Sequence, residues 1–204
     1  YIWSDECSVE WGRGKVSEGG FGSKVDKWKP EFVQTYSKAK GLSIIIWACF
    51  WGSRRSNLYF LNRDFKSEKY GYTANSYIEL LNDQLPQSWI PGLIFIQDNT
   101  SIHTARTIRN WFKEYDIPMS DWPPISPDLN RIEYVWWHLK KKVLELHPEL
   151  ENETSKSDQA YTALGNTIEE ASNALPNSLF ESLWKSMPDC VKACYEAKGW
   201  HIKY

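Results

Sequence analysis

The stretch LIFIQDNTSIHTARTIRNWFKEYDIPMSDWPPISPDLNRIEYVWWHLKKKV (residues 93–143) decides how the rest of the chain is arranged. It opens with a short apolar run, residues 93–97, whose length and branched side chains predict a buried strand that stops at Asp98. From Thr104 onward the apolar residues have the i, i+3, i+4, i+7 spacing of one helix face: Ile108, Trp111, Phe112 and Tyr115. The stretch therefore predicts a strand, an acidic residue at its end and a helix, in that order.

A second helix follows the proline-rich segment 122–127, which cannot be regular structure because each proline fixes φ and lacks an amide donor. Its buried stripe is predicted to be Ile132, Val135, Trp136, Leu139 and Val143. The adjacent face presents an acid, an aromatic ring and two cations: Glu133, Trp137, Lys140 and Lys141. Two interpretations of Glu133 stay open at this point, a site carboxylate or the N3 residue of a capping box with Asn130 as N-cap.

A third acid stands at the start of the chain, where residues 1–9 predict another strand with Asp5 in its middle. Hydrolysis or transfer at a phosphodiester needs several carboxylates that converge on two divalent ions about 3.5–4 Å apart. Asp5, Asp98 and Glu133 can supply such a site, and carboxylate oxygens are the ligands that Mg²⁺ prefers. We therefore predict that these three acids are catalytic and hold two Mg²⁺ or Mn²⁺ ions.

The order of these acids, and three motifs along the chain, resemble the DDE catalytic domain of the mariner superfamily of cut-and-paste DNA transposases. The motifs are QDNTSIH (97–103), PPISPDLNRIEYVWWHLKKKV (123–143) and SMPDCVKACYEAKGWHIKY (186–204), and residues 99–132, 34 in number, separate the second acid from the third. The resemblance runs from the first residues to the last. It implies an RNase H-like fold, hydrolysis at transposon ends and strand transfer of the 3′ hydroxyl into target DNA. It also implies a homodimer or larger synaptic assembly and, in a eukaryote, a nuclear protein.

The chain departs from the family's pattern in two places. Arg131 stands where the family has proline, which leaves Glu133 in register. Asp189 and Cys190 stand where the family has two arginines, which removes two positive charges from the last motif. Two other functions stay open beside the transposase: a domesticated, noncatalytic DNA-binding or assembly protein, and a metal-dependent nuclease without strand transfer.

Further residues are expected to support the acids or to contact DNA. Asn99, His103 and Asn130 are predicted to orient the carboxylates or a phosphate without binding metal. Trp137 is placed to stack on an unpaired base, and the cations are placed to contact phosphates. For the cations, simple solvation is the open alternative. The predicted DNA contacts are Trp137, Lys140, Lys141, Arg54, Arg55 and Arg106.

Length and composition indicate a single domain spanning residues 1–204. The net charge of −2 is unlike that of a free nucleic-acid binder, so DNA binding must depend on local clusters of cations. Four cysteines without a CxxC pair predict reduced thiols. No apolar run is long enough to span a membrane and no signal peptide begins the chain, so we expect an intracellular protein.

The remaining segments predict an α/β fold with a mixed five-stranded sheet and helices on both faces. The apolar run 43–50 predicts a central strand and residues 57–62 a neighbouring one. A helix from Thr73 to before Pro91 then leads into the strand at 93–97, a crossover that places two parallel strands in one sheet. A helical tail ends the chain.

Three predictions concern regions outside this sheet. The glycine-rich segment 11–40 is expected to form a loop or hairpin, and the resemblance implies a loop that clamps the partner subunit. Residues 145–158 are expected to be an acidic surface loop. Nothing before Asp5 has room for a helix-turn-helix module, so we expect the N-terminal DNA-binding domain to be absent and the chain to be a fragment.

Overall fold

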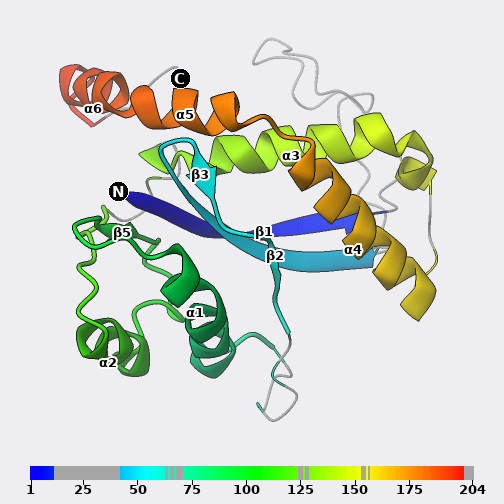
Figure 1. Ribbon diagram of the computed structural model, residues 1–204, viewed down its shortest axis with the longest axis horizontal. Coiled ribbons are helices and arrows are strands. Elements are labelled where there is room, and N and C mark those ends of the chain that lie inside the picture. Colours follow the sequence, from blue (N-terminus) through cyan, green and yellow to red (C-terminus); the bar gives the residue numbers. More distant parts are fainter. Residues whose placement is uncertain are drawn as a thin grey trace, which may run out of the picture.

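A computed structural model describes residues 1–11, 42–62, 64, 67, 71–123, 126, 129–152, 155 and 157–199. These residues form a mixed sheet with helices on both faces, as predicted (Figure 1). The glycine-rich segment from residue 12 onward and the clamp loop expected in it lie outside the described residues, so that expectation stays a prediction.

The sheet is built on one long antiparallel pair of strands. Its strands are β1 (Ile2–Trp11), β2 (Leu42–Trp51), β3 (Arg54–Arg55), β4 (Tyr59–Phe60) and β5 (Phe95–Ile96). β3 and β4 both pair antiparallel with β2, whereas β5 pairs parallel with β1. On its other side β5 forms a parallel bridge from Phe95 to Met119. The predicted mixed five-stranded sheet is therefore confirmed.

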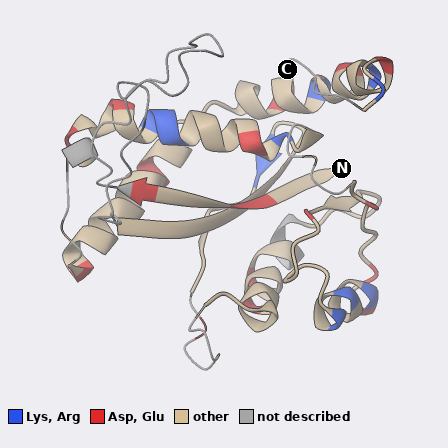
Figure 2. Cartoon of the chain, turned by 180° about the vertical axis from the view of Figure 1, so that it is seen from behind, with Lys and Arg blue, Asp and Glu red and all other residues tan. Residues whose placement is uncertain are grey.

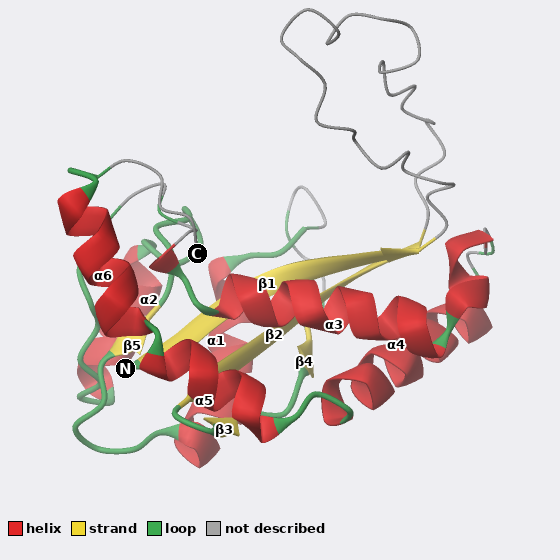
Figure 3. Ribbon diagram, turned by 90° about the horizontal axis from the view of Figure 1, so that it is seen from above, coloured by secondary structure: helices red, strands yellow, loops and turns green. Residues whose placement is uncertain are grey.

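Helices cover both faces of this sheet (Figure 3). They are α1 (Ala74–Ser88), α2 (Arg106–Glu114), α3 (Ile132–Leu146), the 3-10 helix η4 (Pro148–Asn152), α4 (Asp158–Asn173), α5 (Asn177–Lys185) and α6 (Met187–Glu196). α1 and α2 lie on one face, and α3, α4 and α5 lie on the other. None of the described helices is both long and apolar enough to cross a membrane.

The hydrophobic core has two layers, one on each face of the sheet. Trp3 and Cys7 of β1 lie in the layer beneath α3, whereas Ile2 lies in the layer beneath α1 and α2. Because successive side chains of a strand point to opposite faces, Asp5 projects toward α3 and Glu6 toward α1 and α2. This alternation decides which helices each of the two acids can meet.

Two local expectations differ from the structure. Residues 145–158 are not wholly a loop, because they include the end of α3 and η4, where Leu150 is buried in the core. Tyr115 is 49% exposed, because α2 ends at Glu114 and the Tyr115 ring stacks on Trp111 instead. All four cysteines are free thiols, as predicted.

Candidate active site

Asp5 and Asp98 leave two neighbouring strands at the same level. β1 and β5 pair at Ile2–Phe95 and Trp3–Ile96, and each acid lies two residues beyond the second pair. Glu133 reaches the same place from the first turn of α3. The three carboxylates line one cavity of about 320 Å³. The fold thus gathers the three predicted acids, although their catalytic and metal-binding roles stay predictions.

The cavity holds negative charge that the protein compensates only in part. Burial, followed by repulsion from Glu6 and Glu133, raises the pKa of Asp5 to about 8. Burial also raises the pKa of Glu133, and the positive charge of Lys140 opposes this effect. An empty cavity therefore disfavours full ionisation of its acids.

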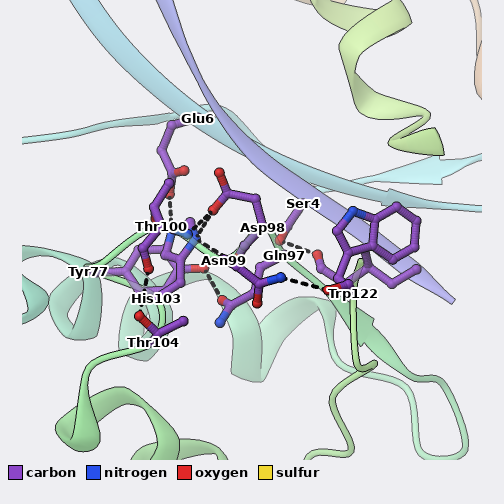
Figure 4. A network of polar contacts seen from close by, with 11 residues as sticks. Ser4, Glu6, Tyr77, Gln97, Asp98, Asn99, Thr100, His103, Thr104 and Trp122 are labelled. Atoms are coloured by element: carbon purple, nitrogen blue, oxygen red, sulfur yellow. Dashed lines mark hydrogen bonds and ion pairs between the residues drawn. The ribbon is translucent and has the colours of Figure 1, made fainter. Parts of the chain in front are cut away.

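Asp98 has a different environment, because a buried histidine holds it (Figure 4). The Nδ1 of His103 lies 2.6 Å from Asp98 Oδ1, and the Thr100 amide donates to the same oxygen over 3.0 Å. Burial alone would raise the pKa of Asp98, but the hydrogen bonds from His103 and Thr100 hold it below its usual value. His103 does not line the cavity of the three acids, and its predicted supporting role stays a prediction.

The second nitrogen of the His103 ring meets a residue that we did not predict. Nε2 lies 3.1 Å from Glu6 Oε1. Burial would lower the pKa of His103, yet its hydrogen bonds to Asp98 and Glu6 raise that pKa to about 10. At neutral pH the ring is therefore an imidazolium that donates to a carboxylate on each side.

The capping-box interpretation of Glu133 is wrong. The N-cap of α3 is Arg131, which has helical φ and ψ and makes no side-chain capping hydrogen bond. The amide of Glu133 does bond to Asn130, but to its backbone carbonyl at 3.1 Å. The Asn130 side chain is buried instead at the wall of the cavity, where its Oδ1 has no hydrogen-bond partner. The Glu133 carboxylate is therefore left for the cavity.

The donor set of this cavity suits a hard divalent cation. Three carboxylates and the Asn130 side chain line it, and carboxylate and amide oxygens are ligands that Mg²⁺ and Mn²⁺ take. In the described part of the chain, no three acidic, histidine or thiol side chains are gathered tightly enough to hold an ion as they stand. Asp5 is buried and is also repelled by Glu6 and Glu133, which disfavours a closer approach of the ionised acids.

Asn99 fixes the wall of the cavity opposite α3. Its side-chain amide donates to the carbonyl oxygen of Trp122 over 2.6 Å. The Trp122 ring in turn packs edge-on against Trp3, with 5.6 Å between ring centroids. Asn99 thus ties the end of β5 to the proline-rich loop, and its predicted role in supporting the carboxylates stays a prediction.

Most of the chain matches one known family of proteins. The DDE superfamily endonuclease family matches residues 20–154, which are 135 of the 204 residues. The chain belongs to this family.

Relatives of this DDE endonuclease chain include two nematode transposases. It is 28% identical to the transposable element Tc1 transposase of Caenorhabditis elegans and 27% identical to the Tcb1 transposase of Caenorhabditis briggsae. Each match covers 100% of this chain and 70% of the relative.

Solved structures similar to the DDE endonuclease chain come from the Mos1 transposase. The Mos1 strand transfer complex matches with a TM-score of 0.66 at 18% identity, and the match covers 99% of this chain and 55% of the Mos1 chain. The Mos1 catalytic domain matches with a TM-score of 0.61 at 15% identity, covering 99% and 83%. These likenesses confirm the predicted RNase H-like fold. The chain spans about half the length of the Mos1 chain in the complex.

Three predicted DNA contacts of the DDE endonuclease chain are exposed residues of α3. Figure 2 shows a basic segment in this helix. Trp137 is 58% exposed, and Lys141 Nζ lies 5.5 Å from the centre of its ring. Lys140, also exposed, is close enough to Glu133 for its charge to act on that carboxylate. This face of α3 therefore continues from the cavity, with an aromatic ring and two cations.

The three predicted arginine contacts are placed differently. Arg106 begins α2 and is exposed, and Arg54 is exposed in β3. Arg55 packs within the protein, since its guanidinium lies 4.8 Å from the centre of the Phe180 ring and donates to the Leu175 carbonyl over 3.3 Å. These contacts give Arg55 a place in the packing between β3 and α5.

Sequence reasoning missed Glu6 and Tyr77. Glu6 follows Asp5, but it points to the other face of the sheet and its partner His103 is 97 residues away. Tyr77 packs against the His103 ring with 4.4 Å between centroids, and its hydroxyl donates to Gln97 over 2.8 Å. One signal was available for Glu6, an acid at a strand position that faces a predicted buried layer.

Proposed function

We propose that this chain is the catalytic domain of a cut-and-paste DNA transposase. It hydrolyses a phosphodiester at the transposon ends and directs the freed 3′ hydroxyl to a phosphodiester of target DNA. The observation that carries the proposal is the convergence of Asp5, Asp98 and Glu133, from three separate segments, on one cavity. Membership of the DDE endonuclease family and the transposase names of its relatives support it.

The proposed cofactor is a pair of Mg²⁺ or Mn²⁺ ions held by Asp5, Asp98 and Glu133. Structures of the Mos1 catalytic domain with raltegravir and Mg or Mn, which match with TM-scores of 0.58 and 0.56, support the use of divalent metal. When bound, such ions activate an attacking oxygen and stabilise a leaving oxygen. The chain itself supplies the ligands.

The protein's own residues hold the Asp98 carboxylate and one wall of the cavity in place. His103 and the Thr100 amide fix one oxygen of Asp98, so that the carboxylate cannot rotate freely. Asn99 holds the Trp122 segment as one wall of the cavity. A phosphodiester that enters is thus confined between this wall and Glu133.

The proposed partners are transposon-end and target DNA, bound by a homodimer or a larger synaptic assembly. The similar Mos1 structures include a strand transfer complex and a paired end complex, which supports this assembly. Trp137, Lys140 and Lys141 are the proposed contacts beside the cavity. A nuclear location, in a eukaryotic source, is part of the same proposal.

A strand-transfer assay on the full-length protein tests the proposed function. Precleaved transposon ends are incubated with target DNA and Mg²⁺ or Mn²⁺, and joined products are separated by size. Joined products, lost in Asp98→Asn, support a transposase. Cleavage without joining would indicate the nuclease instead, and binding without cleavage would indicate the noncatalytic DNA-binding protein.

A further inference from the structure

We infer that Glu6 is a positioning residue, which acts through His103 to hold the Asp98 carboxylate at a fixed place beside Asp5. The inference rests on the proposed function, because it concerns how the two acids are kept at the spacing that a shared pair of ions requires. Glu6 touches neither the cavity nor, on this proposal, the substrate.

The need for such a residue follows from how early the strand pairing stops. β1 and β5 pair at Ile2–Phe95 and Trp3–Ile96. One buried hydrogen bond, from Ser4 Oγ to the Ile96 carbonyl at 2.7 Å, continues the connection. Asp5 and Asp98 lie beyond these bonds. Something other than the ladder must therefore set the distance between their side chains.

The chain Glu6–His103–Asp98 bridges this gap. His103 is only 3% exposed, and its two nitrogens lie 3.1 Å from Glu6 Oε1 and 2.6 Å from Asp98 Oδ1. The ring also packs against Tyr77, whose hydroxyl is anchored on Gln97 (Figure 4). The ring is thus fixed at both nitrogens and on one side, and it has little freedom to rotate.

The position of Glu6 in β1 explains how the bridge can link Asp98 to Asp5. Glu6 is the backbone neighbour of Asp5, but it points to the opposite face of the sheet. The His103 ring is hydrogen-bonded through one nitrogen to Glu6, which directly follows Asp5 in β1. Its other nitrogen is hydrogen-bonded to Asp98, so the position of Asp98 depends on that of the strand segment that carries Asp5. Neither Glu6 nor His103 lines the cavity of the three acids, so the bridge joins Asp5 and Asp98 without occupying that cavity.

A rival explanation is that Glu6 only compensates the charge of a buried imidazolium. Two conservative variants distinguish the effect of the length of the Glu6 side chain from the effect of its charge. Glu6→Gln keeps the length of the side chain and an oxygen for Nε2–H, but loses the charge. Glu6→Asp keeps the charge, but withdraws it by one methylene group. Positioning requires the longer reach, whereas charge compensation requires the carboxylate.

The readout is the Mn²⁺ affinity of the DNA-free full-length protein, measured by calorimetry, together with strand transfer. We expect Glu6→Asp to weaken Mn²⁺ binding by about 10- to 100-fold, the usual effect of losing a residue that orients a metal ligand. Glu6→Gln should weaken Mn²⁺ binding by less than about 10-fold. Glu10→Asp, a change of the same size on the same strand, should bind Mn²⁺ like wild type. Equal affinity in both Glu6 variants, or greater loss in Glu6→Gln, would overturn the inference.

A double-mutant cycle tests whether the effect passes through the histidine. In a His103→Asn background, Glu6→Asp should cause little further loss, because the bridge is already broken. If the two substitutions weakened Mn²⁺ binding independently, so that their fold-losses multiplied, Glu6 would not act through His103. Wild type that binds Mn²⁺ with this dependence on Glu6 but joins no DNA would overturn only the proposed function. Normal transfer and affinity in Glu6→Asp would overturn only the positioning role, and wild type that binds no Mn²⁺ would overturn both.

Discussion

Asp5 and Asp98 line the same cavity, yet their pKa values are displaced in opposite directions. Asp5 is buried near Glu6 and Glu133, and its pKa rises to about 8. Asp98 meets the His103 ring at 2.6 Å, and its pKa falls below the usual value. Burial first, and then repulsion from neighbouring acids, therefore disfavours the charged form of Asp5, which a bound cation should favour.

The first prediction concerns the stability of the metal-free protein as pH changes. The ordinary pKa of an aspartate carboxyl is 3.8 and that of Asp5 in the folded protein is about 8, so the folded state binds the proton more tightly. Between those values the folded state carries more protons than the unfolded state, and the free energy of unfolding should fall as pH rises. Urea denaturation at pH 5, 6 and 7 with a chelator measures this.

Asp5→Asn is the control for that pH dependence. The variant lacks the titrating group, so its unfolding free energy should change less between pH 5 and pH 7. The raised pKa of His103 adds a loss of stability of the same sign, which begins above about pH 6.5 and extends to about pH 10. A wild-type stability that rises across pH 5 to 7 would contradict the assignment of Asp5.

The second prediction is that divalent ions stabilise the folded protein. An ion that binds only the folded state at roughly a hundred times its Kd adds about 2.7 kcal/mol to the free energy of unfolding. Mn²⁺ should act at lower concentration than Mg²⁺, following the usual order of affinity. Thermal melts with each ion measure the shift. Asp5→Asn should be more stable than wild type without metal and should respond less to it; identical responses would show that Asp5 binds no ion.

The third prediction concerns catalysis. Asp98→Asn and Glu133→Gln should each lower the rate of DNA cleavage by at least about a thousandfold, the scale expected when an essential member of a catalytic group is lost. Circular dichroism should show an unchanged fold. Glu114→Gln, an exposed acid at the end of α2, serves as the control and should cleave normally. Cleavage at the wild-type rate by either test variant would remove that acid from the mechanism.

The fourth prediction concerns the exposed face of α3. Replacing both Lys140 and Lys141 by alanine should weaken DNA binding and reduce the slope of log K against log salt by roughly 0.9 for each phosphate that is no longer neutralised. The matched control is Lys185→Ala, because that lysine is exposed on α5 and pairs with Glu181 at 2.6 Å. A salt slope equal to that of wild type would mean that the two α3 lysines are only solvated.

The fifth prediction separates two adjacent arginines of β3. Arg55→Ala should lower the free energy of unfolding by about 1–3 kcal/mol, because it removes a hydrogen bond to the Leu175 carbonyl and a cation–π interaction with Phe180. Arg54→Ala, at the exposed neighbouring position, should change stability little. Chemical denaturation of the two variants measures the difference, and equal losses of stability would argue against the packing role.

Patterns that depend on local sequence predicted most of the fold. The apolar run of β2, the helix periodicity of α3 and the order of Asp5, Asp98 and Glu133 are features of strand and helix geometry, and the structure has each in its expected place. Prediction from local sequence was wrong where the same residue spacing is compatible with two structures. Asn130 and Glu133 have the spacing of a capping box, but Arg131 begins the helix and Asn130 points to the cavity.

Contacts between distant segments were beyond sequence reasoning. Glu6 meets His103 across 97 positions, and Arg55 meets Leu175 across 120, so neither pair leaves a periodic signal. The same limit affects electrostatics. Three equivalent acids in sequence predict shared repulsion, whereas in the structure the hydrogen bond from His103 lowers the pKa of Asp98 and burial raises the pKa of Asp5 and of Glu133. Charge distribution depends on tertiary packing, which local sequence patterns do not specify.

The bridge from Phe95 to Met119 has a further consequence for association between chains. An unpaired strand edge offers free amides and carbonyls to a neighbouring molecule and promotes aggregation. Here the Phe95 amide donates to the Pro118 carbonyl, and the Ser120 amide donates to the Phe95 carbonyl. The strand that leads to Asp98 is thus shielded from solvent on this side. Pro118 lacks an amide donor, so the new border is a poor template for another strand. A border of this kind disfavours edge-to-edge joining of the sheets of neighbouring chains when the protein is concentrated.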